Sequence, residues 1–172
     1  MSTDEKRRSD NTFKNITAVA ATIAAVIAFA VVIVFLVGGQ RNVRDGLIVE
    51  FSYGSGSGMG GYVQYTLKRQ DNLALLEINR SGLSEDEAGD IKKTVDGEYL
   101  DKLATIINEN EVARWDGFDK SDSSVLDGDG FVLKVKYDDE KTIEAHGYMI
   151  YPGNYRVVTD KFAELFSEME QL

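Results

Sequence analysis

The 172-residue sequence predicts an α+β domain that follows an N-terminal transmembrane helix. Three features support this fold class: a long uncharged apolar run, several stretches in which apolar and polar residues alternate, and two stretches with helical periodicity. The expected element order is β-β-β-β-α-β-β-α. Strands joined as hairpins, with the helices segregated from them, predict one antiparallel sheet with helices packed on one face.

The apolar run occupies residues 16–37, ITAVAATIAAVIAFAVVIVFLV, and contains no charged residue. A helix of this length reaches ~33 Å, enough to cross a ~30 Å hydrocarbon core. Four basic residues precede the run and two follow it closely, which favours a cytoplasmic N-terminus. We therefore expect a single-pass protein of the cytoplasmic membrane, with a cytoplasmic tail (1–15), a signal anchor (16–37), a tether (38–46) and an extracytoplasmic domain (47–172).

The alternative to an anchor is a cleaved signal peptide, whose apolar region is usually shorter, roughly 7–15 residues. Ala28-Phe29-Ala30 has the form of a cleavage site, but the apolar run continues through Val37. Ala20, Ala24 and Ala28 recur every four residues, and such small residues allow close helix packing. The anchor therefore also offers a candidate homodimer interface.

The domain after the anchor is strongly acidic. From Leu47 onward it carries 13 basic and 25 acidic residues, a net charge of −12, and the whole chain contains no cysteine. A surface this negative repels phosphate backbones, so nucleic acid is not an expected partner. The lack of cysteine excludes disulfides, thiolate metal sites and a lipidated N-terminal cysteine.

The first three strands are expected at Leu47–Tyr53, Tyr62–Arg69 and Leu73–Arg80. In the first of them Leu47, Val49, Phe51 and Tyr53 belong to the same apolar face. Short connections between the three stretches predict an antiparallel meander.

A glycine-rich segment, GSGSGMGG, separates the first two strands and contains the G-x-G-x-x-G pattern at Gly56–Gly61. A dinucleotide-binding loop must open a helix, whose N-terminus then binds the pyrophosphate. Here the residues after the glycines alternate with period two, as in a strand. The segment is therefore interpreted as a flexible hairpin loop.

The remaining elements are a fourth strand at 91–95, a helix from about 97 to 109, a second hairpin at 131–137 and 141–149, and a last helix from about 155 to 171. Asp96 is the expected N-cap of the first helix, and Pro152 precedes the second. The apolar helix faces comprise Tyr99, Leu100, Leu103, Ile106 and Ile107 in the first, and Val158, Phe162, Leu165, Phe166 and Met169 in the second.

The segment DGFDKSDSSVLDGDG is the candidate metal site. Its ligands would be Asp116, Asp119, Asp122, Asp127 and Asp129. Oxygen-rich loops of this kind suit calcium, but no register matches the EF-hand pattern. The favoured interpretation is an acidic turn region with Asx-type bends. No cofactor is expected otherwise.

Aromatic residues provide the candidate binding surface: Trp115, the only tryptophan, with Tyr148, Tyr151 and Tyr155 around Pro152. Amphipathic rings of this kind suit protein contacts. The alternative, that they pack the sheet against the last helix, is equally compatible with the sequence.

Catalysis has little support. His146 is the only histidine, and a G-x-S-x-G nucleophile elbow is missing from the sequence. An envelope hydrolase that uses His146 as its base is kept as an alternative function.

Three segments, LIVEFSYGSGSGMGGYVQYTL, EVARWDGFDKSD and YPGNYRVVTDKFAELF, resemble extracytoplasmic domains of Gram-positive anaerobic bacteria that are held by a signal anchor or a lipid. The resemblance implies location and fold, and the absence of cysteine points to the signal-anchored type. That group is poorly characterised and carries no established activity. We therefore expect a binding or interaction module with a protein partner in the cell envelope and no catalytic activity, with a calcium-responsive domain as the first alternative.

Overall fold

The computed structural model describes residues 46–57, 59–82 and 89–172. The predicted tail, the predicted membrane segment and the tether up to residue 45 lie outside the described residues. Within the described ranges, no helix is both long and apolar enough to cross a membrane.

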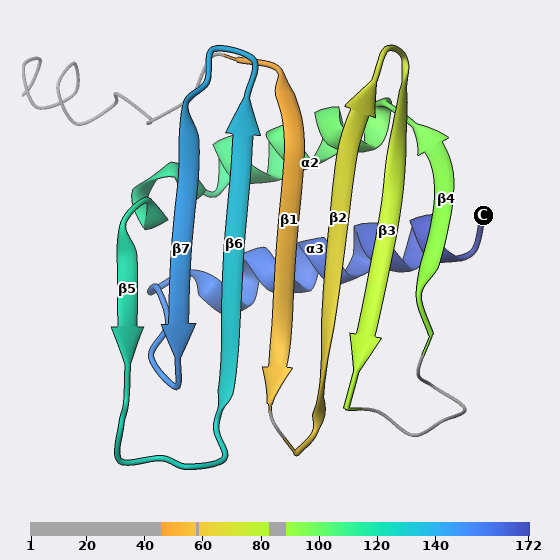
Figure 1. The fold of residues 1–172 in the computed structure, drawn as a ribbon. Helices are drawn as coiled ribbons and strands as arrows, with labels where there is room; N and C mark the ends of the chain where they lie inside the picture. The colour runs from red at the N-terminus through yellow and green to blue at the C-terminus, as the bar shows by residue number, and fades with distance from the viewer. Residues whose placement is uncertain (1–45, 58, 83–88) are drawn as a thin grey trace, which may run out of the picture. The chain divides into compact units, whose positions relative to one another are not determined.

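In the described part of the chain, seven strands form one sheet in the order β4-β3-β2-β1-β6-β7-β5. The strands are β1 (Ile48–Ser57), β2 (Gly61–Gln70), β3 (Leu73–Ser81), β4 (Ile91–Asp96), β5 (Phe118–Ser121), β6 (Asp129–Tyr137) and β7 (Thr142–Tyr148). The helices are α2 (Glu98–Glu109), α3 (Tyr155–Glu170) and the short 3-10 helix η1 (Val112–Trp115). Both α2 and α3 cross behind the strands in Figure 1.

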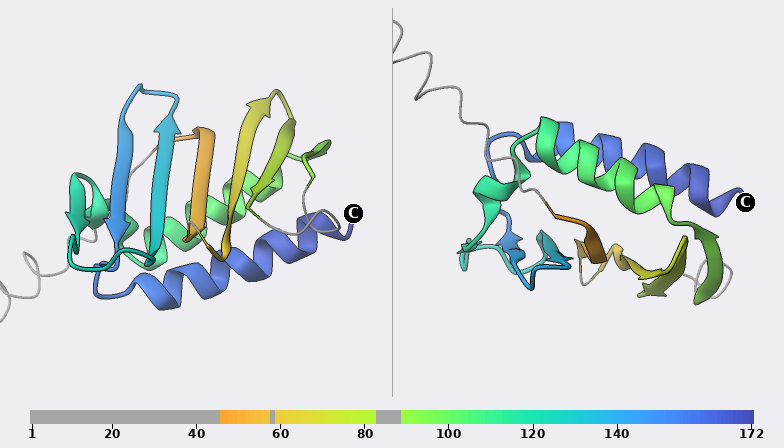
Figure 2. Two further views of the ribbon diagram at one scale, coloured as in Figure 1. Left: turned by 60° about the horizontal axis from the view of Figure 1, so that its bottom comes forward. Right: turned by 90° about the horizontal axis from the view of Figure 1, so that it is seen from above.

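The two long helices lie on the same side of the sheet (Figure 2). Residues therefore alternate along the strands between a buried face under the helices and a polar face toward solvent. In β6, for example, Phe131, Leu133 and Val135 are buried. On the polar face, Lys134 of β6 pairs with Glu144 of β7 at 2.9 Å. The expected α+β class with a single sheet is confirmed.

The apolar faces predicted for the two helices form part of the core. All five residues of the second predicted face are buried in α3, and Tyr99, Leu100, Leu103 and Ile107 are buried in α2. The N-cap of α2 is Gly97 and not the predicted Asp96, because α2 begins one residue later than expected. Asp96 still accepts a hydrogen bond from the backbone N–H of Glu98 at 2.9 Å.

The prediction of a wholly antiparallel sheet was wrong, because the sheet is mixed. The strand β5 was not predicted, and it pairs in parallel with β7, with Phe118 opposite Ala145. This edge strand has only four residues, and three of them are exposed. A short, polar edge strand has no alternating apolar pattern from which it could be recognised.

The predicted apolar face of the first strand was also wrong at its start. Ile48 is 1% exposed, whereas Leu47 is 45% exposed. The pairing of β1 with β6 shifts register between Ile48 and Glu50. Such a bulge adds one residue to the strand and reverses the faces on its two sides. Phe51 and Tyr53, beyond the bulge, are buried as expected.

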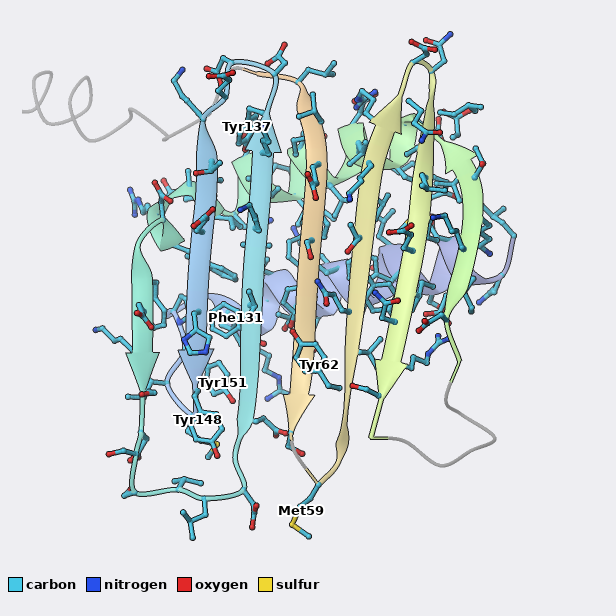
Figure 3. The ribbon with its side chains drawn as sticks, in the orientation of Figure 1. Met59, Tyr62, Phe131, Tyr137, Tyr148 and Tyr151 are labelled. Carbon is cyan, nitrogen blue, oxygen red and sulfur yellow. The ribbon has the colours of Figure 1, made fainter. Side chains whose placement is uncertain are left out.

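The glycine-rich segment is mostly strand rather than loop. Residues Gly54–Ser57 belong to β1 and pair with the start of β2. The last pair of this hairpin places Ser57 opposite Gly61. A strand follows the glycines, and not the helix that a dinucleotide site needs. Tyr62 reaches across β1 (Figure 3), where a Cβ on Gly54 would lie 2.6 Å from the Tyr62 Cζ. Gly54 therefore provides room for a ring on the polar face of the sheet.

Candidate functional site

A groove of about 680 Å³ runs between α3 and the ends of β1, β2 and β6. The sheet contributes Tyr53, Val63, Tyr65 and Gly130, and the segment before α3 contributes Tyr151. The volume falls within the ~300–1,000 Å³ that is typical of ligand sites.

One side of α3 forms the long wall of the groove, with Thr159, Asp160, Ala163, Phe166, Ser167 and Glu170. These residues recur at intervals of three and four and therefore share one face of the helix. At ~1.5 Å per residue, the wall from Thr159 to Glu170 is ~16 Å long. The groove is thus elongated along α3, which crosses behind the strands in Figure 1.

Aromatic rings form much of the groove surface. Tyr151 stacks on Tyr155 with ring centroids 4.6 Å apart, and Tyr155 lies 4.6 Å from Phe131 beneath it. Further along α3, Tyr65 stacks on Phe166 at 4.0 Å. The rings are therefore held by one another and by the core, so the shape of the groove is already formed before any ligand binds.

The tyrosine hydroxyls in the groove are hydrogen-bonded. The hydroxyls of Tyr53 and Tyr155 lie 2.9 Å apart, and Tyr65 donates to Glu170 at 2.7 Å. Burial, together with the neighbouring Glu170 carboxylate, raises the pKa of Tyr65 to about 12. Burial and the hydrogen bond to Tyr53 also raise the pKa of Tyr155. These phenols therefore stay neutral at physiological pH.

The charges in the groove are negative. None of the described residues that line it is a lysine, arginine or histidine, whereas Asp129, Asp160 and Glu170 are carboxylates. Arg80 neutralises Glu170 from outside the lining at 2.8 Å. Within the described part of the chain, Asp129 and Asp160 have no ion-pair partner. Burial raises the pKa of Tyr151, and the charge of Asp129 raises it further. The Asp129 carboxylate therefore acts electrostatically on an aromatic ring of the groove.

The predicted aromatic surface divides into two parts. Tyr151 and Tyr155 line the groove, and Trp115 packs behind Tyr155 with centroids 5.8 Å apart. Trp115 is buried and donates to the Asn154 side chain at 2.9 Å. Tyr148 instead accepts a hydrogen bond from Gly128 and donates one to Val125. Trp115 and Tyr148 thus support local structure, and neither lines the groove.

The five predicted metal ligands lie at separate positions. Among the described residues, no group of three or more acidic or histidine side chains could share one metal ion. Asp116 accepts from the backbone N–H of Glu144 at 3.0 Å, and Asp122 accepts from both the backbone and the hydroxyl of Ser124. Asp129 lines the groove, while Asp119 lies beside His146. Asp127 is exposed in the loop before β6.

His146 lines a second, smaller hollow of about 360 Å³ on the polar face of the sheet. Its Nδ1 lies 3.1 Å from Asp119 Oδ1, and the two side chains are 50% and 83% exposed. No described residue that lines this hollow is a serine or threonine. The described lining therefore offers no hydroxyl nucleophile to this pair.

Apart from Asp129, Tyr151 and Tyr155, the residues that line the groove were not predicted as site residues. Tyr53 and Tyr65 follow the alternation of ordinary core positions. Asp160 and Glu170 resemble solvent-facing positions of an amphipathic helix. The sequence does show that Thr159, Asp160, Ala163 and Ser167 form a small and polar strip beside the apolar face, and that strip is the one signal of a groove.

No family model and no curated protein matches this chain. The resemblance to extracytoplasmic domains of Gram-positive anaerobes therefore remains a prediction from the sequence.

Proposed function

We propose that this chain is a membrane-anchored extracytoplasmic binding module, and that the groove along α3 is its ligand site. The observation that carries the proposal is the groove itself: it is elongated and walled by stacked tyrosines, whose hydroxyls are already hydrogen-bonded. Aromatic walls with a few polar groups are typical of binding sites. The apolar segment 16–37 would hold the module at the membrane, and its alanine face would allow a homodimer.

The proposed partner is a protein of the cell envelope. An extended peptide rises ~3.3 Å per residue, so the ~16 Å wall of α3 matches about five residues. Tyrosine is enriched at protein contacts because its ring and hydroxyl offer apolar and polar contacts together.

Filling the groove tests this proposal. Ala163 is exposed on the groove wall, so Ala163→Trp would block the groove without entering the core. Val157 is exposed on α3 and does not line the groove, which makes Val157→Trp the matched control. Basic, acidic and apolar pentapeptides would be titrated into the full-length chain in neutral detergent. We expect at least one class to bind the parent and the control but not Ala163→Trp; equal binding to all three proteins would contradict the proposal.

A hydrolase is the second candidate function, supported by the contact between Asp119 and His146. An acidic side chain that orients a histidine is found in many hydrolases, where the histidine activates a nucleophile. Loss of a measured hydrolytic activity in His146→Ala, with thermal unfolding unchanged, would support it.

A further inference from the structure

We propose that the groove along α3 recognises a lysine or arginine side chain of an extended peptide segment. This inference rests on the proposed function and adds the chemistry of the ligand. Two properties of the groove carry it: its uncompensated negative charge and the tyrosine rings close to that charge.

The first property is charge complementarity. Asp129 lies at the start of β6, and Asp160 lies in the second turn of α3. Both are exposed and both line the groove, and neither pairs with a basic side chain in the described ranges. Glu170 differs, because Arg80 and Tyr65 already bind its carboxylate. The two carboxylates that could bind a cation, Asp129 and Asp160, therefore lie at the end of the groove near Tyr151 and Tyr155.

The second property is the aromatic surface at that same end. Tyr151 and Tyr155 stack at 4.6 Å, and the Asp129 charge contributes to the raised pKa of Tyr151. A cation above an aromatic ring is attracted by the electron-rich face of that ring. A basic side chain could therefore contact a carboxylate and a tyrosine ring together, while its aliphatic stem covers apolar surface.

The shape of the groove favours a peptide over a compact amine. A single ammonium group would occupy only the end near Asp160, whereas the wall continues for three turns to Glu170. Main-chain groups of a peptide could fill the remainder, beside Ala163 and Ser167.

A pair of peptides isolates the contribution of charge. Acetyl-Gly-Gly-Lys-Gly-Gly-amide and its norleucine counterpart have the same stem, and only the first carries the ammonium group. Calorimetric titration into the full-length chain in neutral detergent should give about tenfold tighter binding for the lysine peptide, a difference that shrinks at high salt.

Matched variants locate the effect. Asp129→Asn and Asp160→Asn should each weaken lysine-peptide binding several-fold and leave norleucine-peptide binding unchanged. Glu164→Gln removes the same charge from an exposed position on α3 outside the groove lining, and it should preserve binding. Equal loss in Glu164→Gln would show that only the net charge of the domain acts, and this would overturn the inference.

The remaining outcomes separate the inference from the proposed function. Equal binding of both peptides, lost in Ala163→Trp, would overturn the cationic ligand but keep the groove as a binding site. Binding of N-acetyl-lysine amide as tightly as the pentapeptide would replace the peptide by a small amine. Absence of any binding to the lysine peptide would overturn the inference, and failure of all peptide classes would remove the proposed function as well.

Discussion

The hydroxyl of Tyr155, the first residue of α3, lies 2.9 Å from the hydroxyl of Tyr53 in the central strand β1. This contact joins the start of the helix to the sheet at the base of the groove. Because Tyr155 also packs on Phe131 and Tyr151, the same residue organises the core and the candidate binding surface.

Removing one hydroxyl of this pair should reduce stability modestly. Tyr155→Phe leaves the Tyr53 hydroxyl without its partner, and we expect the free energy of unfolding to fall by about 0.5–1.5 kcal/mol. Urea denaturation measures the change. In a double-mutant cycle, adding Tyr53→Phe should cost less than it does in the parent. Fully additive costs would mean that the two hydroxyls do not interact in solution.

Stability should decrease at alkaline pH because of Tyr65. Its pKa is about 12 in the folded protein, against an ordinary value of 10.0. The folded state therefore holds the phenolic proton more tightly, so this contribution is complete below about pH 10 and is lost as pH rises toward about 12. We expect the free energy of unfolding to fall between these limits, and to fall less in Tyr65→Phe. The same slope in both proteins would contradict the assignment.

Gly54 should tolerate no side chain while Tyr62 lies across it. A Cβ there would lie 2.6 Å from Tyr62 Cζ, so Gly54→Ala should displace the ring and lower thermal stability. The expected cost is about 1–3 kcal/mol, as for other overpacked sites. Gly153 faces open space and its Gly153→Ala variant is the control. Tyr62→Ala should remove most of the penalty, and a penalty that persists would point to the backbone instead.

Calcium should not stabilise the domain selectively. The candidate ligands Asp116, Asp119, Asp122, Asp127 and Asp129 are distributed over the loops and strands around β5, without a shared centre in the described structure. Thermal unfolding of the full-length chain with calcium, magnesium and matched ionic strength tests this. A bound ion at ~100 times its dissociation constant would contribute ~2.7 kcal/mol. A saturable, calcium-selective rise that is lost in Asp127→Asn would restore the metal hypothesis.

The sequence predicted the elements that are long and periodic. Six of the strands and both long helices carry apolar residues at intervals that one buried face requires, as in Phe131–Tyr137 and in α3. The predictions that proved wrong have local physical causes. The bulge between Ile48 and Glu50 changes the face of the sheet on which Ile48 lies, and the amino-acid composition of the strand does not reveal it. The strand β5 forms because it pairs with β7, and its own residues show no strand pattern.

The candidate site was only partly predictable. Tyr151 and Tyr155 were recognised as a group because they are close in the sequence. Their partners Tyr53 and Tyr65 come from strands about 100 residues earlier and reach the groove only through the sheet order. Separation in sequence likewise hid the pairing of Asp119 with His146.

NMR on the full-length chain in neutral detergent would show directly whether the lysine peptide binds in the groove along α3. Backbone amide shifts would be followed through a titration. A peptide bound in the groove should cause saturable changes at Gly130, Ala163 and Ser167, and little change at Val132 and His146 on the opposite face. Changes confined to the surface around His146, or no saturable change at all, would contradict a binding site along α3.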